Sequence, residues 1–230
     1  LFFCPTFREI LNVHFLKLLQ RIFLKMRIID LFSGVGGLTF GFYYRKYKDH
    51  FVRNRKNQFV FANEYNPLAA KAYSENYPDI PMKNCDIKSL KESDIRKWIG
   101  SEPVDLIIGG PPCQSFSTVG QRNYDEKAQL YTEYLRVLKI ARPKMFLFEN
   151  VRGILSMREI FYKRDAAGNI LYELKDVEGR ESLTPRKKPV IDHYGKSVME
   201  ILNDQFSNLG NGLGYNIWTE RLNAMDYGVP

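Results

Sequence analysis

The sequence predicts an α/β protein built on a doubly wound, mostly parallel sheet. From residue 26 onward, short apolar runs rich in β-forming residues alternate with segments of helical periodicity, the pattern of strand–helix–strand units. The chain has 230 residues, of which 44% are hydrophobic, so it can bury one substantial core. A glycine-rich turn directly after the first apolar run is the third indication, because folds of this class bind ligands at such turns.

The first half of the chain predicts three short strands with helices between them. We expect strands over residues 27–32, 59–62 and 82–85, and helices over residues 38–44 and 67–76. Pro67 stands at the first turn of the second helix, where its missing N–H group is not needed for an intrahelical bond.

Two continuous apolar runs in the middle of the chain, 104–108 and 145–148, predict strands buried on both faces. A helix is predicted between them over residues 127–142, because apolar side chains recur there at helical spacing. Residues 195–209 are predicted to be helical, and residues 215–222 to form a later strand.

Two polar, basic stretches, residues 45–58 and 158–196, interrupt this alternation and are interpreted as insertions. They are either solvated loops or contacts to a nucleic-acid backbone. The formal net charge of +8 and the pI near 9.3 favour a polyanionic partner without identifying it.

The three cysteines, Cys4, Cys85 and Cys113, have no CxxC spacing, so the sequence predicts neither a disulfide framework nor a metal site, and a reducing, cytoplasmic setting fits. Residues 1–25 are interpreted as an N-terminal extension to the main domain, residues 26–230. Polar and charged residues interrupt the extension, so we expect no membrane span. An amphipathic helix fits its spacing, but Met26 before the first strand favours a segment upstream of the usual start.

The turn after the first strand contains Ser33, Gly34, Gly36 and Gly37, which let the backbone approach a ligand closely. A nucleotide-like ligand is implied. Residue 39 is threonine, so the turn departs from the GxGxxG pattern of dinucleotide-binding folds.

Acidic residues follow the second and third predicted strands. Glu64 stands where a carboxylate can accept hydrogen bonds from both hydroxyls of a ribose, although alone it could be a solvated or helix-terminal acid. Asp86 could accept from an adenine amino group, or it could form a cap or turn before Lys88. Cys85 is interpreted as a small buried hydrophobe.

The most specific pattern follows the fourth predicted strand, where Gly109-Gly110-Pro111-Pro112-Cys113-Gln114 presents a thiol at the carboxyl edge of the sheet. Cys113 in this context is interpreted as a nucleophile. Glu149 ends the neighbouring strand, so a thiol and a carboxyl group can face one ligand.

In this order, these segments resemble the cytosine-C5 DNA methyltransferases, and the resemblance covers residues 26–230. It implies a Rossmann-like sheet of the S-adenosylmethionine-dependent methyltransferase type. The implied cofactor-binding residues are Phe32, Ser33, Gly34, Gly36, Gly37, Glu64, Asp86, Ile87, Pro112 and Leu130. Cys113 and Glu149 are the implied catalytic residues, and residues 223–230 are similar to the approach to the family's next motif.

The resemblance also implies the reaction. The thiolate of Cys113 would add to C6 of a cytosine flipped out of DNA, Glu149 would stabilise the ring at N3, and S-adenosylmethionine would donate a methyl group to C5. Double-stranded DNA is the implied partner, and a restriction-modification system the implied setting.

The family's arginine-containing segment and target-recognition region would follow Pro230, where this sequence stops. We therefore expect a truncated product, or one part of a split enzyme whose partner chain carries the recognition region. Three alternatives remain: a transfer RNA methyltransferase with the same chemistry, a non-catalytic nucleic-acid-binding relative, and a nicotinamide oxidoreductase, against which the missing third glycine argues.

Overall fold

The computed structural model describes residues 25–111, 130–175, 186–223 and 226. Its centre is a sheet of five strands: β1 (Arg27–Leu31), β4 (Gln58–Glu64), β5 (Met82–Asn84), β6 (Leu106–Gly109) and β7 (Met145–Phe148). Their order across the sheet is β5-β4-β1-β6-β7, and every neighbouring pair is parallel. The predicted α/β class with a doubly wound parallel sheet is confirmed.

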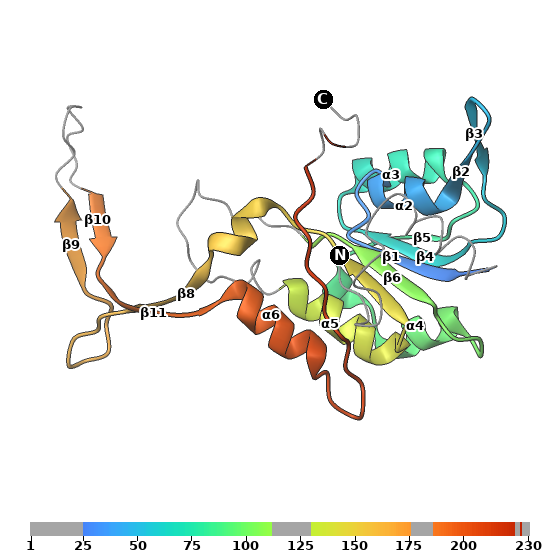
Figure 1. The fold of residues 1–230 in the computed structure, drawn as a ribbon. Helices are drawn as coiled ribbons and strands as arrows, with labels where there is room; N and C mark the ends of the chain where they lie inside the picture. Colours follow the sequence, from blue (N-terminus) through green and yellow to red (C-terminus); the bar gives the residue numbers. More distant parts are fainter. Residues whose placement is uncertain (1–24, 112–129, 176–185, 224–225, 227–230) are drawn as a thin grey trace.

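The strand order reverses between β1 and β6, so the crevice outside their carboxyl ends is where such folds bind ligands. Helices join the successive parallel strands, and they lie on both faces of the sheet. Helices α2 (Gly37–Tyr43) and α3 (Pro67–Asn76) cover one face, and α4 (Glu92–Ile99), α5 (Leu130–Ala141) and α6 (Val198–Ser207) lie on the other (Figure 1).

The central strands β1 and β6 are apolar on both sides because both faces of the sheet are covered there. Ile28 and Ile108 pack into the cluster under α2 and α3, whereas Ile29 and Ile107 pack into the cluster under α4 and α5. Alternation along the strand thus divides one continuous apolar run between two cores.

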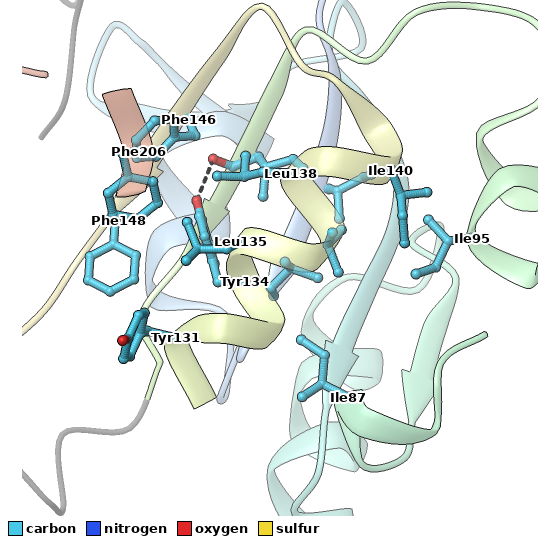
Figure 2. Packing of buried hydrophobic residues seen from close by; sticks show 14 of the residues in the cluster. Ile87, Ile95, Tyr131, Tyr134, Leu135, Leu138, Ile140, Phe146, Phe148 and Phe206 are labelled. Carbon is cyan, nitrogen blue, oxygen red and sulfur yellow. Dashed lines mark hydrogen bonds between the residues drawn. The ribbon is translucent and has the colours of Figure 1, made fainter. Parts of the chain in front are cut away.

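The larger core centres on Tyr134 of α5, whose ring packs against Phe146, Phe148 and Phe206 (Figure 2). Its hydroxyl lies 3.1 Å from the carbonyl oxygen of Ile107 and 3.0 Å from that of Leu147. A buried tyrosine needs such a partner, and this one ties α5 to β6 and β7 close to their carboxyl ends.

A polar network lies inside the opposite core, beneath the glycine-rich turn. Thr39 donates to Asp30 Oδ2 (2.5 Å) and shares a hydrogen bond with the hydroxyl of Tyr73 (2.8 Å). Asp30 is 1% exposed, and its Oδ1 has no partner in the described part of the chain. Burial, and to a lesser extent the charge of Glu64, raise the pKa of Asp30 from 3.8 to about 7, although the bond from Thr39 opposes the shift.

Most predicted elements have structural counterparts. The helix predicted over 67–76 is α3, with Asn66 capping its first turn, and the run 145–148 is β7. The helix predicted over 195–209 is shorter, because residues up to Ser197 belong to a strand and Ser197 begins α6 with a capping box. Of the helix predicted over 127–142, residues 127–129 lie outside the described residues.

Two predictions need correction. Residues 215–222 form no strand: the N–H of Tyr215 donates to Phe206 and its hydroxyl to Pro143, so the segment packs along the end of α6 without a ladder partner in the described chain. The basic stretch 45–58 is not a plain loop, because it contains the antiparallel pair β2 (Tyr44–Tyr47) and β3 (His50–Arg53).

The second basic stretch also contains strands. Its described parts form two antiparallel ladders, β8 (Arg158–Tyr162) with β11 (Ile191–Ser197), and β9 (Tyr172–Lys175) with β10 (Arg186–Pro189). These ladders form an arm that extends away from the sheet (Figure 1). Short 3-10 segments, η1 (Ile87–Ser89) and η3 (Arg152–Ser156), follow β5 and β7.

The predicted N-terminal extension lies almost wholly outside the described residues. Within the described ranges, no helix is long and apolar enough to cross a membrane. The same residues contain no group of three or more histidine, cysteine or acidic side chains placed to hold a metal ion.

The raised pKa of Asp30 predicts a pH-dependent stability. Between pH about 4 and about 7 the folded protein keeps a proton on Asp30 that the unfolded chain has released, so the free energy of unfolding should fall as the pH rises. Asp30→Asn should remove this loss, which is at most about 4 kcal/mol. Urea unfolding across this pH range measures it.

Asp49→Asn, at an exposed carboxylate, is the control for the same charge change. If the wild-type protein and Asp30→Asn lose stability in parallel as the pH rises, the assignment to Asp30 is wrong.

Candidate active site at the carboxyl edge of the sheet

The glycine-rich turn joins β1 to α2 and is held by the neighbouring strand. The N–H of Ser33 donates to the carbonyl of Asn63 (3.0 Å) and that of Gly36 to the carbonyl of Ser33 (2.9 Å). Gly36 has φ of 96°, and a Cβ there would collide with the ring of Tyr77, whose hydroxyl donates to the Gly36 carbonyl. Only glycine fits this position.

Other parts of the turn leave room for a ligand. A Cβ built on Gly34 or Gly37 would meet nothing within 4 Å, so their backbone is open to a close approach. The Oγ of Ser33 is buried and has no hydrogen-bond partner in the described chain. Phe32 adopts φ of 55°, which is uncommon for a bulky residue and is the kind of local strain found at functional sites. These features fit a cofactor lying over the turn.

Glu64, at the end of β4, is joined directly to this turn. Its Oε2 accepts from the N–H of Gly34 (2.8 Å) and its Oε1 from the N–H of Asn66 (2.7 Å). The structure thus brings the predicted ribose-binding acid and the predicted cofactor turn into contact. Each carboxylate oxygen has a second lone pair, so the group can still accept from a ligand.

Asp86 begins η1, and its Oδ1 accepts from the N–H of Lys88 (2.9 Å). The capping role considered from the sequence is therefore confirmed. The side chain is exposed, and no hydrogen bond within the described ranges uses Oδ2, so that oxygen is available to a ligand. Cys85, expected to be buried, is only partly buried and packs against the larger core.

Ile87 and Leu130 occupy different environments. The side chain of Ile87 is 3% exposed inside the core, and its carbonyl accepts from Arg136 (2.9 Å). It therefore anchors the segment that carries Asp86, and a contact with a cofactor stays a prediction. Leu130 is partly buried at the start of α5. Pro112 and Cys113 lie outside the described residues.

Glu149 lies beside the segment that leads to Cys113. Its N–H donates to the carbonyl of Gly109 (2.9 Å), and its Oε2 would be 2.7 Å from a Cβ on Gly110. Asn150 donates from Nδ2 to the carbonyl of Pro111 (3.2 Å). The acid and its neighbour thus hold the last described residues before the predicted nucleophile.

Glu149 also lines a cavity of about 290 Å³. Its walls come from α2, from the end of β7 and the η3 segment after it, from α6 and from residues 219–222. They are mostly apolar, with Arg152 and Arg221 adding cationic groups and Glu220 a second carboxylate. A small cavity with a mostly apolar lining and a carboxyl group such as that of Glu149 can hold a flat ring and place a hydrogen-bonding group at its edge.

Sequence reasoning missed several residues on which this edge depends. Asn63 donates to the carbonyls of Lys83 (2.9 Å) and Cys85 (3.0 Å) and so positions the segment before Asp86. Asp30 lies beneath the glycine turn, and Asn150 holds Pro111. An acid within an apolar strand was the available signal for Asp30, whereas the role of Asn63 depends on contacts that no local pattern encodes.

Comparison with known proteins identifies the family of the chain. A model of the family described as C-5 cytosine-specific DNA methylase matches residues 26–177, more than half of the chain. The Type II methyltransferase M.DdeI of Desulfomicrobium norvegicum is 34% identical over 89% of this chain and 38% of its own length. The Type II methyltransferase M.AgeI of Thalassovita gelatinovora is 42% identical over 57% of this chain and 29% of its own length.

A solved structure of a putative DNA modification methyltransferase encoded within an E. coli prophage is 33% identical, with a TM-score of 0.46, and the match covers 57% of this chain and 34% of that one. The matched parts thus cover well under half the length of these relatives. The family match over residues 26–177 and the 34% identity over 89% of the chain lead to one conclusion: the chain belongs to the C-5 cytosine-specific DNA methylase family.

Proposed function

We propose that the protein carrying this chain transfers a methyl group from S-adenosylmethionine to C5 of cytosine in double-stranded DNA. The observation that supports this most is the contact of Glu149 with Gly110, at the start of the segment that contains Cys113. Family membership supports the same chemistry. Two relatives are named Type II methyltransferases, and we extend the proposal to a restriction-modification setting.

In the proposed reaction the thiolate of Cys113 forms a bond to C6 of the cytosine, and the electrons of the C5–C6 double bond become available at C5. Glu149, held beside Gly110, donates a hydrogen bond or proton to N3 and stabilises the negative charge that gathers on the ring. After C5 has gained the methyl group, a base such as water removes its proton, and the electrons return to C5–C6 as Cys113 leaves.

The residues around the glycine turn fit the role of a cofactor site. Gly34 and Gly37 leave the backbone accessible, Glu64 has free lone pairs for two ribose hydroxyls, and Asp86 has a free carboxylate oxygen for an amino group. When bound, S-adenosylmethionine would supply an electrophilic methyl group on a sulfonium ion, and the sulfur–methyl bond would break with its electron pair left on a neutral thioether. The turn and Glu149 both lie at the carboxyl edge of the sheet, so both reactants can meet there.

Cytosine in a duplex is stacked, so its C6 cannot reach a thiol until the base is flipped out, at a cost of a few kcal/mol. The cavity beside Glu149 is a suitable receptor for such a base, because its walls are largely apolar and the carboxyl group of Glu149 can bond the ring edge.

Transfer of a labelled methyl group to duplex DNA and to transfer RNA, with the complete protein that contains this chain, tests the proposal. We expect DNA to be labelled and the product to be 5-methylcytosine. Transfer to RNA alone would establish the transfer RNA alternative, and transfer to neither would establish a non-catalytic relative.

Gly110→Ala is predicted to damage the reaction without damaging the fold. The new Cβ would lie 2.7 Å from Oε2 of Glu149, so the carboxyl group must move. Moving this carboxyl group out of its position should lower kcat/KM by about 10²-fold. Stability should change little, because only the end of a side chain shifts. Steady-state methylation and thermal unfolding measure the two effects.

Gly109→Ala is the matched comparison. Its Cβ would lie 2.5 Å from the carbonyl oxygen of Leu31 and 2.9 Å from the ring of Tyr134, so it should destabilise the protein by about 1–3 kcal/mol. Wild-type activity of Gly110→Ala, or unchanged stability of Gly109→Ala, would contradict the assigned contacts.

Glu64→Gln is predicted to weaken cofactor binding. An amide has one acceptor oxygen, so it cannot accept from the N–H groups of both Gly34 and Asn66 and bond a ribose as well. The dissociation constant for S-adenosylmethionine should rise about 5- to 100-fold by calorimetry. Glu75→Gln, on the exposed side of α3, is the control, and equal affinities in the two variants would refute the role of Glu64.

A further inference from the structure

The hairpin of β2 and β3 projects from the edge of the sheet opposite to the carboxyl ends of the strands. It lies between α2 and β4, and the N–H of Gln58, at the start of β4, donates to the carbonyl of Met26 just before β1 (2.8 Å). The hairpin therefore stands near the amino ends of the strands (Figure 1). Glu64 ends β4 and Glu149 follows β7, so both lie at the carboxyl ends.

This hairpin and its next few residues, 44–56, concentrate the positive charge of the protein. The segment contains six lysine or arginine residues and one acid, Asp49. It thus contributes five of the eight net positive charges of the whole chain. Like charges this close repel one another, so their accumulation favours a polyanionic ligand that would offset the repulsion.

One of the six cations has a structural role. Arg53 pairs with Asp79 (3.0 Å), bonds main-chain carbonyls and lies over the ring of Tyr43 at 3.8 Å. The other five are exposed, and no carboxylate in the described part of the chain lies within ion-pairing distance of them. They are Arg45, Lys46, Lys48, Arg55 and Lys56.

The surface between the hairpin and the following loop is a groove of about 880 Å³. Arg45, His50, Arg55 and Lys56 contribute to its lining, and Met26, Tyr47 and Val52 add apolar surface. The ring of Tyr47 is 49% exposed, with Arg45 and Lys48 over it at 5.7 and 5.8 Å. The groove thus gathers cationic side chains around a partly exposed aromatic ring, and its cations suit the phosphates of a nucleic-acid backbone.

We propose that residues 44–56 bind the phosphodiester backbone of duplex DNA, at a segment other than the one that carries the target base. The choice of DNA as the polyanion rests on the proposed function, but the binding itself needs no catalysis. A second contact of this kind would hold the protein on DNA while the carboxyl edge engages a cytosine, because tethering raises the local concentration of each site for its ligand.

The salt dependence of duplex binding tests the proposal with the complete protein. A variant in which Arg45, Lys48, Arg55 and Lys56 are changed to glutamine removes four exposed charges from the hairpin segment. The control variant changes Lys71, Lys91, Lys97 and Lys139 to glutamine, which removes four exposed charges from helices and their flanks. Fluorescence anisotropy with a non-target duplex gives the dissociation constant of each between about 50 and 200 mM KCl.

The hairpin variant should bind more weakly, and its plot of log K against log salt concentration should be shallower by about 0.9 for each phosphate that the variant no longer neutralises. The control should keep the wild-type slope. Equal slopes for the hairpin variant and the wild type, which a surface for an acidic protein would give, overturn the proposal. An equal reduction of the slope by both variants would also overturn the proposal, because it would reflect net charge alone.

Failure of this proposal can be distinguished from failure of the proposed function. At saturating DNA the hairpin variant should keep the wild-type kcat for methyl transfer, because none of its residues lies at the carboxyl edge. A shallower slope in a protein that methylates nothing would support the second contact and refute the reaction. Methylation of DNA with an unchanged slope would support the reaction and refute the second contact.

Discussion

The close approach of three strands at their carboxyl ends is the constraint on which the rest of the site depends. Gly109 lets the end of β6 lie against the main chain of Leu31, and Gly110 lets it lie against the carboxyl group of Glu149. A side chain at Gly109 would push the main chain of β1 away, and one at Gly110 would displace the carboxyl group of Glu149. Tyr134 stabilises the same region from the side of α5, because its hydroxyl lies within hydrogen-bonding distance of carbonyls of β6 and β7. Two glycines thus allow a cofactor turn and an acid to share one edge.

The two edges of the sheet differ in chemistry because the parallel order directs all strand ends of one kind to the same side. The carboxyl edge carries the glycine turn, Glu64 and Glu149, which suit a cofactor and a base. The amino edge carries the basic hairpin, whose segment 44–56 contains a single acid. On this account chemistry and DNA retention are separate properties of opposite edges, and substitutions at one should leave the other intact.

Much of the fold could be predicted because strands covered on both faces have continuous apolar sequences, as residues 145–148 illustrate. The β2–β3 hairpin could not, because charged residues obscure any alternation of its exposed strands. Residues 215–222 look like a strand locally, but Tyr215 packs on Phe146 instead of entering a ladder. For the site, the sequence predicts the contact partners of neither Glu64 nor Glu149, since both depend on pairing between distant strands.

In the proposed reaction Glu149 acts on a cytosine that is bonded covalently to Cys113. The most direct measurement is mass spectrometry of the complete protein after incubation with S-adenosylmethionine and a duplex containing 5-fluorocytosine, whose fluorine prevents release of the enzyme. Wild type should form a stable adduct, Cys113→Ala none, and Glu149→Gln much less, since activation of the ring at N3 would be weakened. An equal yield from Cys113→Ala, or no adduct from wild type, would contradict the account.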